Sequence, residues 1–538
     1  MKKTVNLLLI YTILSVYNCA NVSTPSGGEK DETPPKLIAS IPENGQTKFT
    51  GQTLLLTFDE WVMTQNIESD IIITPRIQGS FRTRVKKNIL ELTFFEPFNE
   101  STTYSISFGR TIKDVTNNNG VENLSLSFST GDYIDSLSIS GNIRKLLDQE
   151  PIEGVLVTLY NSSDTTNILN GIASFYTNTD SLGNYQFNNL PPDTYRVYAV
   201  KDKNQNNKAD SNNEKYGFYL DSLKLEKNIE DIDFTIQNLN TTDLRRSSAR
   251  HFGNYFDITF NKPITDFQIL SDGEYYYHPQ TSDKVRFYRY QQTFNDTIDL
   301  IYQAKDSLNT ILKDTVSLYF NESKIDKGSF IIAPVPDRPF VQPGATLKFQ
   351  FSKPILSYTL DSIQIEIDSA TVITLSDSLF QFNRYKTELD TRITLSELFK
   401  SRKSTIKLLL GKGSFISADY DTSKVYDKEL GLLREEETAI ISGQVITSSD
   451  NIIVQLINAT NGNVLQESFD KSYTFNYLPA GRYMIRVIDD LNANQQLDIG
   501  NILTNQVPEP VHYYFDSYYQ TKVIEVRKNW QSTANISF

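Results

Sequence analysis

Two short segments of the sequence repeat one pattern of oxygen-bearing side chains. The members of the first segment are Asp202, Asn204, Asn206, Asp210 and Glu214. The members of the second are Asp490, Asn492, Asn494 and Asp498. Both segments place oxygens at relative positions 1, 3, 5 and 9. Because alternate residues of a tight loop can point their oxygens at one hard cation, this spacing predicts a calcium ion (Ca2+) at each segment.

The two segments match only part of the EF-hand loop pattern. Neither has glycine at position 6 or a bidentate acid at position 12, and asparagine stands at positions 3 and 5. A site of this kind would have the weak affinity of extracellular modules, with a Kd of about 10⁻⁴–10⁻³ M. Alternatively, the Asp and Asn side chains only form Asx-turns in exposed hairpin loops. The sequence leaves both interpretations open.

The N-terminus carries a second chemically distinctive residue, Cys19. Lys2 and Lys3 precede an apolar stretch at residues 5–16, which is too short for the roughly 20 residues that span a bilayer. This pattern predicts a lipoprotein signal peptide over residues 1–18, after which Cys19 becomes the acylated first residue. Acyl chains would then anchor the protein to a membrane at about 0.8 kcal/mol per buried CH₂ group. A chance cysteine beside an ordinary cleavage site is the alternative, because residues 15–18 depart from the usual lipobox.

Residues 19–35 are rich in Ser, Thr, Pro, Gly and charged residues, so they predict a flexible tether. No later segment is long and apolar enough to predict a transmembrane helix. The expected product is therefore a water-exposed body held at its N-terminus.

Composition excludes several function classes for this 538-residue chain. Its 52 Lys and Arg against 65 Asp and Glu give a net charge of −13, which argues against a nucleic-acid partner. One cysteine excludes an intrachain disulfide and a cysteine metal cluster. The three histidines, His251, His278 and His512, are too far apart for a His-Glu-x-x-His zinc site. Neither a Gly-x-Ser-x-Gly elbow nor a P-loop is present.

The hydrophobic pattern after Leu37 predicts an all-β protein. Short alternating or apolar runs at 52–58, 71–74, 89–95, 104–108 and 124–128 are separated by Asn, Asp, Gly and Pro clusters. Turn signals about every 8–12 residues are typical of β-sandwiches. One short helix is expected at 395–403. The predicted fold is a tandem array of Ig-like and transthyretin-like sandwiches after the signal peptide and tether.

Two kinds of unit repeat along the chain. A strand ending in Phe, followed by a turn and a β-branched residue, occurs at 57–62, 259–264 and 350–355. A longer unit occurs at 139–197 and again at 441–483, and both copies contain an Ile-Ser-Gly strand and a Leu-Pro-x-x-x-Tyr or Leu-Pro-x-Gly-x-Tyr turn. The order is short, long, short, short, long, which predicts five modules of single-domain size.

The short unit resembles the SbsA-type bacterial Ig-like domain. Its first copy has Pro42-Glu43-Asn44-Gly45, Phe58-Asp59-Glu60, Thr103-Tyr104-Ser105-Ile106, Asp114 and Phe128-Ser129-Thr130-Gly131. The longer unit resembles the carboxypeptidase-regulatory-like, transthyretin-like sandwich, also called Cna protein B-type, through its Pro-x-x-Gly-Val-x-Val and Gly-x-Tyr-x-Phe motifs. The start at Cys19, with Gly27-Gly28 and Thr33-Pro34-Pro35, resembles lipoproteins of Bacteroidetes. The resemblance implies scaffold domains without a common chemistry.

These observations predict five domains after the tether. They are an SbsA-type Ig-like domain at 36–132, a carboxypeptidase-regulatory-like sandwich at 137–238, Ig-like sandwiches at 245–330 and 331–435, and a second carboxypeptidase-regulatory-like sandwich at 438–538.

The predicted function is a non-catalytic lipoprotein of the cell envelope, anchored at the outer membrane, that acts as a structural, adhesive or complex-forming scaffold. Stacked sandwiches on a lipid anchor would form a rod. One alternative is glycan binding by exposed tyrosines at 275–277, 513–514 and 518–519, since aromatic rings stack on sugars. Another is an enzyme with an unrecognised site in 240–430. The partner, whether an envelope protein or a glycan, and the membrane face are left open.

Overall fold

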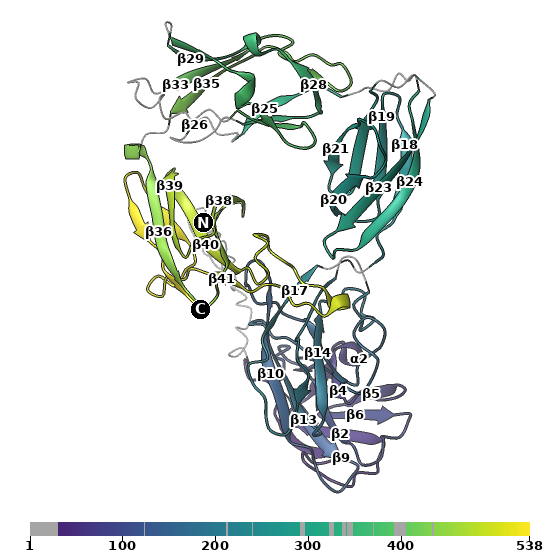
Figure 1. Ribbon diagram of the computed structural model, residues 1–538. Helices are drawn as coiled ribbons and strands as arrows, with labels where there is room; N and C mark the ends of the chain where they lie inside the picture. The colour runs from purple at the N-terminus through teal and green to yellow at the C-terminus, as the bar shows by residue number, and fades with distance from the viewer. Residues whose placement is uncertain are drawn as a thin grey trace, which may run out of the picture.

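The computed structural model describes residues 31–538 except for positions 123, 211–213, 239, 241, 291–295, 322–327, 336–339, 342–347, 369–370, 392–404 and 433–434. Strands dominate the described residues and fall into five groups along the chain, here called modules one to five. The all-β prediction is confirmed (Figure 1). The signal peptide, Cys19 and the helix expected at 395–403 lie outside the described residues. Among the residues described, no helix has the length and apolar character to cross a membrane.

Module one is a sandwich whose inner residues alternate along each strand. In β2, Leu54, Leu56 and Phe58 are fully buried while the residues between them are half-exposed. This period of two lets one face of each sheet enter the core. Its elements are β1 (Leu37–Ile41), β2 (Thr53–Phe58), β3 (Val62–Thr64), α2 (Ile67–Asp70), β4 (Ile72–Thr74), β5 (Phe81–Lys86), β6 (Ile89–Phe94), β7 (Thr103–Ser107), β8 (Ile112–Asp114) and β9 (Ser125–Ser129).

Modules three and four repeat the strand order of module one. Module three contains β18 (Arg246–His251), β19 (Tyr255–Phe260), β20 (Ile264–Ile269), β21 (Tyr276–Thr281), β22 (Lys284–Tyr288), β23 (Thr297–Asp306) and β24 (Ile311–Tyr319). Module four contains β25 (Ile332–Val335), β26 (Phe340–Val341), β27 (Lys348–Phe351), β28 (Ile355–Tyr358), β29 (Ile363–Asp368), β30 (Thr371–Thr374), β31 (Gln381–Phe382), β32 (Glu388–Asp390), β33 (Thr405–Leu410), β34 (Phe415–Ser417) and β35 (Tyr426–Leu432). The four-stranded sheets are ordered β1-β2-β6-β5, β18-β19-β22-β21 and β25-β27-β32-β31, so all three modules share one topology on that face.

The short repeated motif places a buried charge in modules three and four. Lys262, after the Phe of its strand, lies 2.5 Å from Asp306, and both side chains are almost fully buried. Lys353 holds the same place in module four and contacts Asp419 at 2.9 Å. In module one, the buried Asp114 instead accepts three backbone N–H groups of the turn that follows it. A buried carboxylate must be paired or hydrogen-bonded, and the motif meets this need in two ways.

Modules two and five are built on the longer repeat. Module two contains β10 (Leu137–Lys145), β11 (Leu156–Asn161), β12 (Phe175–Asn178), β13 (Asn184–Leu190), β14 (Thr194–Val200), β15 (Lys215–Phe218), β16 (Leu223–Lys224) and β17 (Phe234–Asn238). Module five contains β36 (Ala439–Ile446), β37 (Ile452–Asn458), β38 (Val464–Ser468), β39 (Ser472–Leu478), β40 (Gly481–Asp489), β41 (Val511–Tyr513), β42 (Ile524–Val526), β43 (Gln531–Thr533) and β44 (Ile536–Ser537). Ile139 pairs with Phe187 in the first and Ile441 with Phe475 in the second, so the registers correspond.

The modules do not follow one another as the expected rod, because module five packs back onto module two. The segment between β40 and β41 reaches across module two (Figure 1), where Ile499, Ile502 and Val507 pack against its outer apolar cluster. Leu308, from the β23–β24 turn of module three, enters the same cluster. Its carbonyl accepts the side-chain amide of Asn501 at 3.1 Å.

The first module begins before the predicted boundary at residue 36. The backbone carbonyl of Asp31 accepts the side-chain amides of Asn117 and Asn119, at 3.0 and 2.9 Å. These bonds tie the end of the predicted tether to the turn after β8. Residues 31–35 therefore belong to module one.

Candidate cation-binding loops

The first Asp/Asn segment forms a compact loop after β14. The two carboxylate oxygens of Asp202 each accept a backbone N–H of the loop at 2.7 Å. The side-chain amides of Asn204 and Asn206 both donate to Asp210, at 3.1 and 2.6 Å. Four of the predicted residues are therefore brought together, in Asx-type turns of the kind the sequence left as the alternative.

The second segment has the same construction after β40. Asp490 is buried, and its carboxylate accepts the backbone N–H groups of Asn494 at 3.0 Å and Gln495 at 2.9 Å. The side-chain amides of Asn492 and Asn494 both donate to Asp498. The duplicated spacing thus produces a duplicated geometry.

A buried glutamate closes each loop. Glu214 accepts the backbone N–H of Lys203 at 3.0 Å and that of Asp210 at 3.3 Å. In module five the same two positions of the loop, Leu491 and Asp498, both donate at 2.9 Å to Glu509. Both glutamates are almost completely buried, with exposed fractions of 0% and 3%. Burial raises the pKa of the Glu509 carboxyl, against the two N–H groups, which act to lower it.

Sequence reasoning found Glu214 but missed Glu509. Glu214 follows Asp210 closely, whereas Glu509 is separated from Asp498 by the segment that packs on module two. No spacing rule links the two residues, because the intervening segment folds outward. Glu509 is identified only by comparing the two loops, because in both of them a carboxylate accepts the same pair of backbone N–H groups.

The donor set fits a hard cation only in part. Within the described ranges, no group of three or more His, Cys, Asp or Glu side chains is arranged to hold a metal ion. Each loop would therefore depend on asparagine oxygens as well as its two aspartates. Rotating the side-chain amides of the two asparagines by 180° would replace the N–H groups that now face Asp210 or Asp498 with oxygens.

The loops also lie where modules meet. In the first loop, the side-chain oxygen of Asn207 accepts a guanidinium N–H of Arg76 from module one at 3.1 Å. Beside the second loop, the hydroxyl of Tyr513 donates to the carbonyl of Leu147 in module two at 2.6 Å. The first loop therefore contacts module one, and β41, which follows the second loop, contacts module two.

The tyrosine clusters differ in what they offer to a ligand. Tyr276 is buried and Tyr277 stacks on Phe287, so residues 275–277 form no open platform. Tyr518 and Tyr519, by contrast, are 85% and 72% exposed and lie edge to face.

In region 240–430, a cavity of about 530 Å³ lies over β27, β31 and β32. Its apolar members Phe349 and Leu389 point into the core and are fully buried. His278 is buried against Tyr288, and burial lowers its pKa to about 4. The charged side chains that line the cavity are Lys348, Glu388 and Asp390, and Lys348 lies 3.5 Å from the Asp390 carboxylate.

Two family models match this chain. Residues 31–130 match the bacterial Ig-like domain, and residues 138–212 match the carboxypeptidase regulatory-like domain. Both matches confirm the resemblance for modules one and two. No curated protein matches the chain.

Similar solved structures share little with this chain. They include the major pilin subunit of Bacillus cereus, which is 9% identical over 75% of this chain and 99% of that chain, with a TM-score of 0.14. The S-layer protein SbsC is 11% identical over 92% and 67% of the two chains, with a TM-score of 0.15. A streptococcal ancillary pilin is 15% identical over 46% and 78%, also with a TM-score of 0.15. Likeness at these TM-scores carries no argument about function.

Proposed function

We propose that this protein is a non-catalytic scaffold of the cell envelope, held at the outer membrane by acyl chains on Cys19, as in the lipoproteins of Bacteroidetes that its start resembles. The observation that carries the proposal is the packing of module five on module two. Apolar side chains of one module fill the outer cluster of the other, and Leu308 of module three joins them. Three modules are thereby held in one body, which suits a protein that must hold partners at fixed positions.

The anchor is tested by feeding cells an alkyne-labelled fatty acid and following the full chain. Wild type should carry the label and fractionate with outer membranes. A Cys19→Ser variant should lose both properties, because serine cannot accept the thioether-linked lipid. An unlabelled wild-type chain, or a labelled Cys19→Ser chain, contradicts the anchor.

The scaffold role is tested in the same cells. Deleting the gene should weaken the envelope against detergent, and wild type should restore resistance. Restoration by the Cys19→Ser chain to the wild-type level would show that attachment to the membrane is not needed, and would contradict the proposal.

Calcium binding by the two loops is the second part of the proposal. Its support is the duplicated geometry around Asp202 and Asp490, each closed by a buried glutamate. Calorimetry of the purified chain should detect heat at millimolar calcium, and binding should raise the unfolding temperature. An Asp210→Asn, Asp498→Asn double variant should lose the effect. Absence of both heat and stabilisation in the wild type contradicts it.

A further inference from the structure

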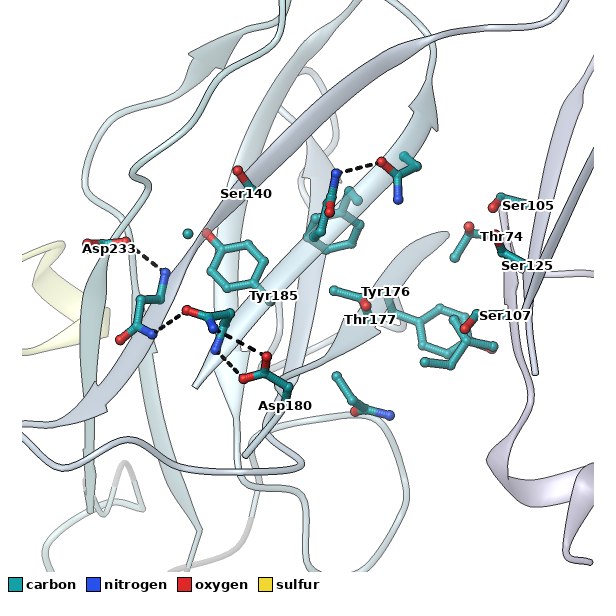
Figure 2. A pocket seen from close by; sticks show the side chains of 18 of the residues that line it. Thr74, Ser105, Ser107, Ser125, Ser140, Tyr176, Thr177, Asp180, Tyr185 and Asp233 are labelled. Atoms are coloured by element: carbon teal, nitrogen blue, oxygen red, sulfur yellow. Dashed lines mark hydrogen bonds between the residues drawn. The ribbon is translucent and has the colours of Figure 1, made fainter. Parts of the chain in front are cut away.

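A polar cavity of about 800 Å³ lies at the junction of modules one and two (Figure 2). Module one supplies one wall from β4, β7 and β9, and module two supplies the other from β10, β12 and β13. Figure 2 shows Thr74, Ser105, Ser107 and Ser125 along one side, and Ser140, Tyr185 and Asp180 across from them. The volume is within the range of small-molecule binding sites.

Contacts between modules one and two hold the two walls together. Arg76 donates its backbone N–H to the carbonyl of Ser174 at 2.7 Å, and its guanidinium lies 4.1 Å from the ring centre of Tyr176. The hydroxyl of Ser127 donates to the side chain of Asn189 at 2.8 Å. The two walls are therefore held in place before any ligand arrives, which lowers the entropic cost of binding.

The cavity is lined by hydroxyl groups that the fold does not use. Alternation along β7 and β9 buries Ile106 and Leu126 completely and turns the serines beside them toward the cavity. Within the described part of the chain, six of the cavity hydroxyls have no hydrogen-bond partner in the protein; they belong to Thr74, Ser105, Ser107, Ser125, Ser140 and Thr177. The hydroxyls of the two lining tyrosines are already bonded, since Tyr176 accepts the backbone N–H of Ile73 and Tyr185 donates to the carbonyl of Ile232. Six hydroxyl groups, each of which can both donate and accept a hydrogen bond, thus face the same cavity.

The charges around the cavity restrict the class of ligand. Asp180, Asp231 and Asp233 outnumber Arg144, which donates to the side chain of Asn142 and the carbonyl of Gln149. Asp180 accepts two backbone N–H groups and a side-chain amide, and Asp233 accepts one backbone N–H, so each uses only part of its acceptor capacity. An excess of carboxylates disfavours anions, and carboxylates accept hydrogen bonds from pairs of sugar hydroxyls. Phe187 and Tyr185 are each only 3% exposed, so the walls offer no deep apolar pocket for a peptide side chain.

We propose that this cavity binds a neutral oligosaccharide. Its unpartnered hydroxyl groups, each of which can donate and accept, match the alternating donors and acceptors of a polyhydroxylated chain. The site differs in place and chemistry from the exposed tyrosines, and it goes beyond the scaffold role by giving the protein a glycan to hold. A polar peptide is the competing occupant, and the experiment separates the two.

The test is calorimetric titration of the full chain with chitohexaose, maltoheptaose, xylohexaose, laminarihexaose and the anionic hexagalacturonate. At least one neutral oligosaccharide should bind, and more tightly than hexagalacturonate. Ser107→Trp and Gln186→Trp fill the cavity from opposite walls, and each should weaken binding by about tenfold or more. Two separate variants guard against misfolding of one, which circular dichroism would reveal.

A matched control exists in module five. Thr474 holds the place on β39 that Gln186 holds on β13, outside this cavity. Thr474→Trp should change affinity by less than about twofold. The proposal is overturned if none of the neutral sugars binds at millimolar concentration, if only hexagalacturonate binds, or if both cavity variants bind like wild type. Loss of binding in a Tyr518→Ala, Tyr519→Ala double variant would also overturn it, because the sugar would then be held by the exposed tyrosines. Displacement of the bound sugar by a hexaserine peptide at equal concentration would overturn it as well.

Discussion

Modules two and five have the same sandwich but use one of its loops differently. In both, a tyrosine hydroxyl reaches over the glycine of the neighbouring strand and donates to a backbone carbonyl beyond it, from Tyr185 to Ile232 and from Tyr473 to Ala534. In both, a buried glutamate closes the Asp/Asn loop. Module two closes its loop with the nearby Glu214, whereas module five first sends residues 499–507 outward and then closes with Glu509.

That difference shows how a repeated domain acquires a docking surface without losing its fold. Both modules have the closing carboxylate because the two backbone N–H groups that donate to it point inward in both loops. The length of chain before it is free to change, and in module five the extra length carries Ile499 and Ile502 to module two. Packing thus constrains the residues of the core. The loop, in contrast, is constrained only at its closing glutamate, where the chain returns to the sandwich.

The largest expected effect tests whether the two cores are equivalent. A Cβ at Gly141 would lie 2.1 Å from the carbonyl oxygen of Ile232, and one at Gly443 would lie 2.0 Å from that of Ala534. Because the obstacle is backbone, Gly141→Ala and Gly443→Ala should each destabilise their module by about 3 kcal/mol. Urea unfolding monitored by circular dichroism measures this loss.

Gly120→Ala is the control for these variants. There the nearest atom to an added Cβ is 3.8 Å away, an ordinary contact. Its stability should therefore stay within about 0.5 kcal/mol of wild type. A tolerated Gly443→Ala beside a damaging Gly141→Ala would show that the two cores differ.

The second prediction removes the docking that distinguishes module five. Ile499→Asp, Ile502→Asp places two charges against the apolar cluster of module two and should cost the interface about 3 kcal/mol. Small-angle scattering should then show a larger radius of gyration, while circular dichroism stays unchanged. Leu503→Asp is the control, because Leu503 lies beside these residues but is 57% exposed. Unchanged scattering from the double variant would contradict the docking.

Sequence patterns predicted the parts of this molecule that depend on local periodicity. Alternation along segments such as 53–58 identified strands and their buried faces, and the duplicated Asp/Asn spacing identified both loops. Glu509 and the return of module five were not predictable in this way, since each depends on residues brought together across module boundaries. The cavity was missed for the same reason: its serines look like ordinary outward residues until a second module faces them.

The third prediction compares the two closing glutamates. Glu214→Gln and Glu509→Gln each replace one acceptor oxygen by an NH₂ group that faces a backbone N–H. Each loop should lose about 1–3 kcal/mol, which is the cost of leaving a buried donor unsatisfied. Thermal unfolding measures it, with the exposed Glu525→Gln as control. If only Glu214→Gln destabilises, then Glu509 is not the structural counterpart of Glu214.

The smallest effect concerns pH and belongs to module five alone. His512 pairs with Val487 at the register position that Gly217 holds opposite Ala199 in module two. Burial lowers the pKa of His512, while Asp489 acts to raise it. As pH falls below the unfolded value of about 6.5, the unfolded chain takes the proton first, so module five loses stability until the folded pKa is reached.

The raised pKa of Glu509 acts in the opposite direction, because acid removes the buried charge. Comparing wild type with His512→Gln in the same buffers cancels that contribution. Urea unfolding at pH 7.5 and pH 5 should show a smaller acid loss in the variant, by at most about 1.4 kcal/mol per pH unit. An equal acid loss in both chains would mean that His512 titrates alike in the folded and unfolded states, which contradicts the prediction.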